Sequence, residues 1–198
     1  MSQIEYLDVV QGSPEWFEAR RGIPTSSMFQ TILAGAEGRL TYMRKLAGER
    51  ITGHPASSYQ SEEMLRGQRL EPEIRAYYEL IRGVEVQKIG FIRNGKFGAS
   101  TDGLVGENGV TEFKSTEPHL LIPMLDKNRV FPPKFYAQCQ GALMASDRVW
   151  CDLVVYWPKM PKLVIRTERD EPYIKQLRDA VDVFDLEIRR LVGRLKAL

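Results

Sequence analysis

Apolar residues recur every three or four positions along four stretches of the chain, and this spacing predicts amphipathic helices. The four stretches cover residues 38–52, 61–81, 134–146 and 170–198. The apolar stripe of the last stretch is typical of a helix that packs against a core. Two shorter helices are predicted near the N-terminus, over 14–22 and from residue 24 onward, because serine, proline and glycine stand at the capping positions.

Runs of β-branched and aromatic residues predict strands between these helices. The strands span residues 84–92, 98–104, 109–115, 150–157 and 162–167. The segment from Thr116 to Pro133 contains four prolines, and we expect it to be irregular. Together these elements predict one α+β domain over residues 1–198, with a central mixed, largely antiparallel sheet flanked by helices.

The composition is that of a globular protein, and no apolar run is long enough to cross a membrane. Of the 198 residues, 43% are hydrophobic and 27% are charged. The first residues form neither a basic n-region nor an apolar h-region, so we expect no export signal and a cytoplasmic location. Cys139 and Cys151 are expected to be reduced core residues. The formal net charge of +2 permits nucleic-acid binding but does not argue for it.

The clearest candidate site lies in a predicted hairpin. Asp102 opens the hairpin, residues 107–109 supply the turn, and Glu112 and Lys114 stand on the return strand. Because side chains alternate along a strand, Glu112 and Lys114 point the same way, and the hairpin brings Asp102 beside them. Two converging carboxylates favour a divalent cation, beside which a lysine orients or deprotonates a water. Taken alone, the same residues also fit a turn and a surface ion pair.

A second candidate is an anion site near the N-terminus. Arg20 stands at the end of one predicted helix, and Ser27 stands at the start of the next. The free N–H groups and positive dipole end of a helix start favour an anion, and phosphate is a natural occupant. In the alternative interpretation, Arg20 compensates the carbonyls of its own helix end and the serines only cap.

Two later helices carry polar residues that need an explanation. Gly67 and Glu71 share a helix face, and the glycine suggests a close neighbour. Pro72 is expected to kink this helix or restart it at Glu71, so Glu71 is either a site residue or a plain acid of a first turn. Gln138 and Gln140 interrupt an apolar pattern, and each therefore needs a polar partner.

In this order the motifs resemble the lambda-exonuclease family of phage recombination nucleases, a branch of the PD-(D/E)xK superfamily. The family segment W-x-x-x-R-x-G-x-x-T-x-S is matched by Trp16, Arg20, Gly22, Thr25 and Ser27. The other matches are G-x-x-x-E at 67–71, S/T-x-D-G-L at 100–104, E-x-K at 112–114 and A-Q-x-Q at 137–140. Thr101 stands where the superfamily name has proline. The resemblance runs from about Gly12 to Trp157, and these motifs in the right order are far more specific than any one of them.

The resemblance implies a restriction-endonuclease-like core that holds metal ions. Asp102, Glu112 and the carbonyl of Phe113 would bind Mg²⁺ or Mn²⁺. Glu71 would serve a second ion or the waters of the metal site.

The resemblance also implies catalytic and binding roles for other matched residues. Lys114 would position the attacking water, and Gln140 would assist beside it. Arg20 and Ser27 would hold the 5′-terminal phosphate of the substrate.

The implied activity is that of a Mg-dependent 5′-to-3′ exonuclease, which degrades one strand of linear double-stranded DNA to mononucleotides. The remaining 3′ strand would serve recombination by strand annealing. A homotrimeric ring, a single-strand annealing protein as partner and the cytoplasm of a bacterial host are implied in the same way.

Two alternatives remain open at this point. One is a structure-specific or restriction-like endonuclease with the same metal site. The other is a catalytically inactive DNA-binding module, against which the joint presence of Asp102, Glu112 and Lys114 speaks. Lys127 and Arg129 either contact phosphates or are only solvated.

Overall fold

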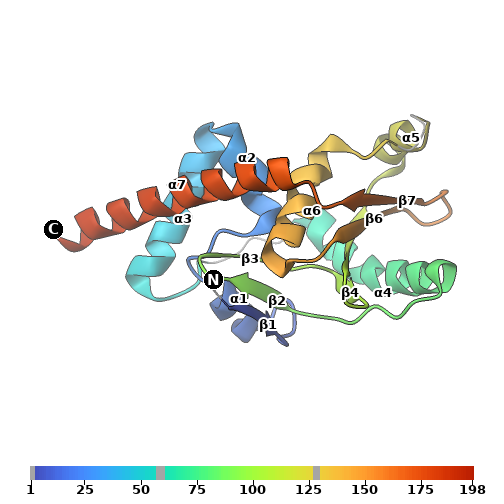
Figure 1. Ribbon diagram of the computed structural model, residues 1–198, viewed down its shortest axis with the longest axis horizontal. Helices are drawn as coiled ribbons and strands as arrows, with labels where there is room; N and C mark the ends of the chain where they lie inside the picture. The colour runs from blue at the N-terminus through green and yellow to red at the C-terminus, as the bar shows by residue number, and fades with distance from the viewer. Residues whose placement is uncertain (1–2, 57–60, 127–129) are drawn as a thin grey trace.

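The strands of the computed structural model form two sheets, and the helices pack around them (Figure 1). The structure describes residues 3–56, 61–126 and 130–198. The first sheet is antiparallel and has the order β1 (Ile4–Leu7), β2 (Phe91–Asn94), β3 (Phe97–Ala99). The second has the order β4 (Gly103–Val105), β5 (Gly109–Ser115), β6 (Trp150–Tyr156), β7 (Leu163–Glu168). Strands β5 and β6 are parallel and the outer pairs antiparallel, which confirms a mixed, largely antiparallel arrangement flanked by helices.

Capping residues correctly predict the start of the first helix, but not of the second. The helix expected from residue 24 is a 3₁₀ turn from Ser26 followed by an α-helix from Phe29, and in the described part of the chain neither has a side-chain cap. Ser13 Oγ accepts the N–H of Trp16 at the first helix, and Asp170 accepts the N–H of Tyr173 at the last. The helices are α1 (Pro14–Arg20), α2 (Phe29–Ala34), α3 (Glu37–Thr52), α4 (Glu62–Arg82), α5 (Pro118–Asp126), α6 (Pro133–Ser146) and α7 (Glu171–Lys196), with a short 3₁₀ helix η1 (Ser26–Met28) before α2.

The second sheet lies between α4 and α6 (Figure 1). Along β6, Cys151 and Leu153 belong to the larger core, to which α6 contributes. Val154 belongs to a smaller core together with Tyr78 of α4 and Phe113 of β5. Because neighbouring residues of a strand face opposite sides, the residues flanking Phe113 face α6. The sheet thus presents Glu112 and Lys114 to α6, as the alternation in the sequence predicts.

Three of the predicted strand and loop boundaries are wrong. The stretch 98–104, predicted as one strand, is divided between β3 and β4, which belong to different sheets. The strand predicted over 84–92 begins only at Phe91, and before it Gln87 forms an isolated bridge to Leu104. The segment 116–133, expected to be irregular, contains α5. Its first residue, Pro118, stands in the first helical turn, where an N–H is not needed. Lys127 and Arg129 lie outside the described residues.

The N-terminal strand β1 is an element that the sequence did not reveal. It pairs with β2, and the N–H of Gly90 donates to Leu7 O at 3.2 Å. A Cβ added at Gly90 would lie 1.8 Å from Val9 O, so the close approach requires glycine.

Helix α4 is continuous through Pro72, contrary to the predicted kink or restart. Glu71 therefore lies in the middle of a long helix. Among the described residues, no heavy atom lies within 4 Å of a Cβ added at Gly67, so the close neighbour expected there is not part of the described chain. Within the same described ranges, no helix is long and apolar enough to cross a membrane.

Candidate active site

Asp102 is held against the return strand of the hairpin by its own backbone and side chain. Its N–H donates to Thr111 O at 3.1 Å, one step beyond the last paired residues of β4 and β5. Its Oδ2 accepts the N–H of Phe113 at 2.6 Å. The predicted hairpin is therefore confirmed, and it brings the Asp102 carboxylate next to Glu112 and Lys114.

Glu112 is the buried centre of this group, with 1% of its surface exposed. Its Oε2 accepts from Lys114 Nζ at 3.0 Å and from Gln138 Nε2 at 2.7 Å. Its Oε1 is also buried, and it has no hydrogen-bond partner among the described residues. A buried carboxylate oxygen without a partner is costly unless something else, such as a cation, contacts it.

Burial and the interactions among Asp102, Glu112 and Lys114 shift the pKa values of all three side chains. Burial raises the pKa of Glu112 to about 7, with a contribution from Asp102 and against the opposing effect of Lys114. Burial also raises the pKa of Asp102, again against the effect of Lys114. Burial alone would lower the pKa of Lys114, but the two carboxylates together raise it above its ordinary value. Lys114 is thus a charged hydrogen-bond donor in this arrangement.

Glu71 reaches the site through Arg75. Arg75 Nη2 pairs with Glu71 Oε1 at 2.8 Å and also donates to the carbonyl of Asp102. The interpretation of Glu71 as an acid of a first turn is wrong, because it stands mid-helix beside the carboxylate pair. Arg75 is a residue that the sequence interpretation missed, although its position four residues after Glu71 fits an ion pair on one helix face.

The structure does not bring Gln140 to the site. Its side chain is fully buried, and it bonds Thr167 Oγ1 at 3.0 Å, Glu168 O at 2.8 Å and the N–H of Asp170 at 3.0 Å. It therefore joins α6 to the start of α7. Residues two positions apart in an α-helix are separated by about 200° around its axis. Gln138 therefore points to the side of α6 opposite Gln140, where it contacts Glu112. The glutamine at the site is Gln138, and the assignment of Gln140 beside Lys114 is corrected.

Ser100 and Trp16 hold the guanidinium of Arg20, the residue around which the sequence predicts an anion site. Arg20 Nη1 donates to Ser100 Oγ at 2.7 Å, and its Cζ lies 4.1 Å from the ring centroid of Trp16. Trp16 Nε1 donates to the same hydroxyl and to Gly90 O, both at 3.0 Å. Burial lowers the pKa of Arg20, against the opposing effects of Tyr42 and Glu49. Arg20 bonds Ser100, which is 80 residues away in the sequence.

Ser27 lies on the same cavity, which has a volume of about 680 Å³. Arg20, Thr25 and Lys45 also line it, and the hydroxyls of Thr25 and Ser27 are 3.4 Å apart. Ser100 is a second missed residue. It belongs to the same motif as Asp102, but only the folded chain shows that its hydroxyl meets Arg20.

The donor set suits a divalent cation that prefers oxygen. Asp102, Glu112 and the Phe113 carbonyl are hard oxygen donors, and the partnerless Glu112 Oε1 is available to an ion. Within residues 3–56, 61–126 and 130–198, no three Asp, Glu, His or Cys side chains converge as a complete cation site. Backbone oxygen, water and substrate would therefore complete the coordination.

Comparisons with known proteins identify a family and similar solved structures. A family model described as a YqaJ-like viral recombinase domain matches residues 15–148. Two similar crystal structures are of LHK-Exo, an alkaline exonuclease from Laribacter hongkongensis, and one of them is a complex with dAMP. The dAMP complex is 32% identical to this chain, has a TM-score of 0.87 and covers 93% of this chain and 97% of that chain. None of the curated proteins matches the chain significantly.

A more distant structure shares the fold. A phage-related exonuclease from Haemophilus somnus 129PT is 14% identical, with a TM-score of 0.65 over 87% of this chain and 96% of that chain. At this identity the likeness shows the fold alone.

Proposed function

The chain belongs to the family of YqaJ-like viral recombinase domains and is a nuclease of the lambda-exonuclease type, and from this premise we propose its reaction. We propose that it degrades one strand of linear double-stranded DNA from a 5′-phosphorylated end, in the 5′-to-3′ direction and with Mg²⁺ or Mn²⁺. Mononucleotides would be released and a 3′ single strand would remain for annealing. The complex of LHK-Exo with dAMP supports a nucleoside monophosphate as product.

One observation supports this proposal: Arg20 bonds a residue that lies only two positions before Asp102 in the sequence. Arg20 donates to Ser100, and Ser100 stands two residues before Asp102. A terminal phosphate held by Arg20, Ser27 and Ser100 would therefore place the neighbouring phosphodiester near Asp102 and Glu112. In such an arrangement the bound terminal phosphate determines which phosphodiester is hydrolysed, so that nucleotides are removed from the end of the strand, as in an exonuclease.

The residues of the chain divide the chemistry among them. Asp102, Glu112 and the Phe113 carbonyl would hold a divalent ion, and Glu71 would serve a second ion or its waters. When bound, such ions lower the pKa of a water and stabilise the charge of the transition state. The ammonium of Lys114 lies 3.0 Å from Glu112 and so stands beside any ion that Glu112 holds. From there it would donate a hydrogen bond that orients the attacking water.

Gln138 and Arg75 would keep the carboxylates in place. Gln138 donates to Glu112 Oε2, and Arg75 holds both Glu71 and the Asp102 carbonyl. Groups that orient metal ligands in this way affect metal binding and activity without contacting the substrate.

We also propose that residues 1–198 act as one nuclease domain and assemble as a homotrimeric ring, as the family resemblance implies. Light scattering on the purified protein tests the assembly. The same resemblance suggests a single-strand annealing protein as partner and the bacterial cytoplasm as location.

The experiment that tests the proposed function compares linear duplex DNA with supercoiled plasmid, each with Mg²⁺. We expect degradation of the linear duplex from its 5′ ends and an intact plasmid. Rapid linearisation of the plasmid would indicate an endonuclease. The absence of any metal-dependent product would indicate an inactive DNA-binding module.

A further inference from the structure

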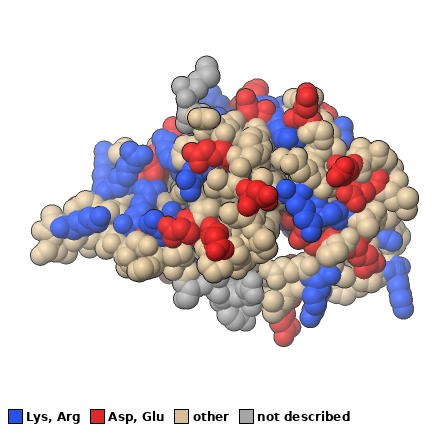
Figure 2. Space-filling view, turned by 90° about the horizontal axis from the view of Figure 1, so that it is seen from below, with Lys and Arg blue, Asp and Glu red and all other residues tan. Residues whose placement is uncertain are grey.

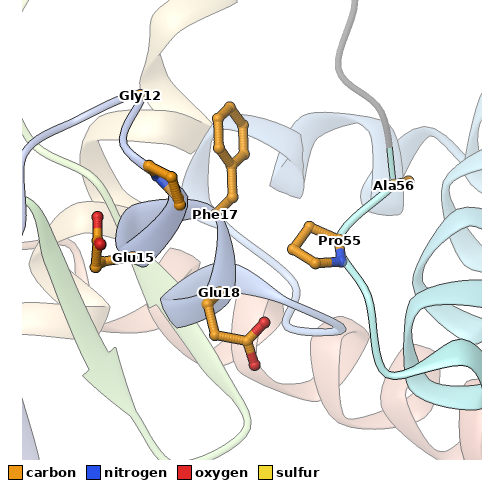
Figure 3. A pocket seen from close by; sticks show the side chains of 7 residues that line it. Gly12, Glu15, Phe17, Glu18, Pro55 and Ala56 are labelled. Atoms are coloured by element: carbon orange, nitrogen blue, oxygen red, sulfur yellow. The ribbon is translucent and has the colours of Figure 1, made fainter.

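A cleft of about 820 Å³ opens beside the pocket that holds Arg20 (Figure 3). Its walls come from α1, from the residues just before α1 and from the segment that follows α3. The lining residues are Gly12, Pro14, Glu15, Phe17, Glu18, Pro55 and Ala56. Figure 3 shows the ring of Phe17 standing on α1, beside the segment that carries Pro55 and Ala56.

The cleft is continuous with the cavity that holds Arg20. Gly12, Phe17, Pro55 and Ala56 line both of them. Phe17 precedes Arg20 by three residues on α1, so the two side chains are neighbours on one helix face. A group attached to an anion at Arg20 would therefore extend past the Phe17 ring.

Phe17 is held in place by a second aromatic ring. The centroids of Trp16 and Phe17 are 5.0 Å apart, and the rings meet edge to face at 76°. Trp16 is itself anchored by its hydrogen bonds to Gly90 and Ser100. Phe17 is thus an ordered aromatic surface and can serve as a stacking platform for a planar ring.

The charges of the two cavities differ in sign. Arg20 and Lys45 line the inner cavity, whereas Glu15 and Glu18 line the outer cleft, where Glu18 also pairs with Arg21. Carboxylates repel a phosphate but accept hydrogen bonds from the exocyclic amines of a base. The charge distribution therefore orients a nucleotide with its phosphate inward and its base in the cleft. Glu49 also lines the inner cavity, but it is occupied by the N–H groups of Gly22 and Ala56.

We infer that the cleft receives the nucleobase of the 5′-terminal nucleotide, which stacks on Phe17 while its 5′-phosphate occupies the Arg20 pocket. This inference rests on the proposed function, because it takes the anion at Arg20 to be a 5′-phosphate. It adds a recognition element for the base to the recognition of the phosphate. Stacking is tolerant of sequence, so any of the four bases would be accepted, and adenine, cytosine and guanine would in addition offer an exocyclic amine to the carboxylates of the cleft.

Calorimetric titration with dAMP and with 2-deoxyribose 5-phosphate tests the inference without relying on nuclease activity. The two probes share the sugar and the phosphate, and only dAMP carries a base. We expect the wild-type protein to bind dAMP about 5- to 150-fold more tightly, because base–aromatic stacking contributes about 1–3 kcal/mol. Phe17→Ala should remove this difference, and Phe17→Trp should restore it. Leu80→Ala, at an exposed apolar residue of α4 that lines neither cavity, should leave it unchanged.

The outcomes separate this inference from the function on which it rests. Equal affinities of the wild-type protein for the two probes, both weakened by Arg20→Ala, would overturn the base site and leave the phosphate pocket intact. No binding of either probe would overturn the phosphate pocket and the base site together. A preference for dAMP that persists in a folded Phe17→Ala variant would overturn the role of Phe17. The comparison of probes on the wild-type protein decides the matter even if that variant does not fold.

Discussion

Arg20 Nη1 donates a hydrogen bond to Ser100 Oγ at 2.7 Å, across 80 residues of sequence. The bond joins α1 to the segment that leads into Asp102, and it brings the cation of the anion pocket to the edge of the carboxylate site. It brings two motifs that are far apart in the sequence into contact, and under the proposed function they form one path for the substrate.

Replacing Arg20 by alanine should slow digestion of 5′-phosphorylated ends. A hydrogen bond to a charged group contributes about 1.5–3 kcal/mol, so we expect a loss of roughly 10- to 150-fold in kcat/KM on such ends. Ends with a 5′-hydroxyl should be affected much less. The measurement is the initial rate on matched duplexes that differ only in the end group.

Arg21→Ala is the control for this prediction. Arg21 is the neighbouring arginine, and its ion pair with Glu18 lies at the surface. The Arg21→Ala variant should keep the preference for phosphorylated ends. Equal losses in the two variants would show that general positive charge, and not a phosphate pocket, is responsible.

The two glutamines of α6 should behave differently. Gln138→Ala should reduce Mg²⁺ affinity or turnover by about 10- to 100-fold, because it removes a group that orients Glu112. Gln140→Ala should instead lower the free energy of unfolding by about 1–3 kcal/mol, because it leaves the N–H of Asp170 and other buried groups without partners. Urea unfolding and activity assays on both variants check this. A folded Gln140→Ala variant with normal stability and no activity would contradict the corrected assignment.

Glu112→Gln should abolish most turnover without unfolding the protein. The carboxylate is buried, and burial raises its pKa to about 7, so the metal-free fold disfavours its charged form and accommodates a neutral amide of the same shape. Turnover should fall by at least on the order of 10²–10³, the loss typical of one electrostatic catalytic group. Thermal unfolding with and without Mg²⁺ provides the second readout. Mg²⁺ should raise the melting temperature of the wild-type protein and not that of the variant.

Alanine substitutions at two glycines test the fold. Gly90→Ala should destabilise the protein by about 1–3 kcal/mol or more, because the added carbon would overlap Val9 O and separate β1 from the chain before β2. Gly48→Ala is the matched control, because no heavy atom of the described residues lies within 4 Å of the added carbon. It lies inside α3 and should stabilise the protein by about 0.5–1 kcal/mol. Denaturant unfolding of the two variants shows whether their effects have opposite signs.

The sequence was most informative where local rules determine the outcome. Strand alternation and turn residues correctly placed Asp102, Glu112 and Lys114 together in the hairpin. Capping residues correctly marked the start of α1. These features depend on residues that are close together in the sequence, so they can be predicted from one sequence alone.

The remaining features depend on contacts that a single sequence does not display. The pattern showed that Gln138 and Gln140 both need polar partners, but only the packing of α6 against β5 and the start of α7 decides which one meets Glu112. Ser100 was recognised as part of a motif, yet its contact with Arg20 arises from the folded chain. The prolines around α5 suggested an irregular loop, although Pro118 is compatible with a helix start.

The central claim is that a 5′-phosphate pocket next to a metal site directs the cut. The most direct test measures nucleotide release from one linear duplex with a 5′-phosphate and from the same duplex with a 5′-hydroxyl, both with Mg²⁺. We predict rapid release of mononucleotides from the phosphorylated end, slow release from the hydroxyl end, and no release from either when the metal is chelated. Equal rates from the two ends in the wild-type protein would contradict the claim.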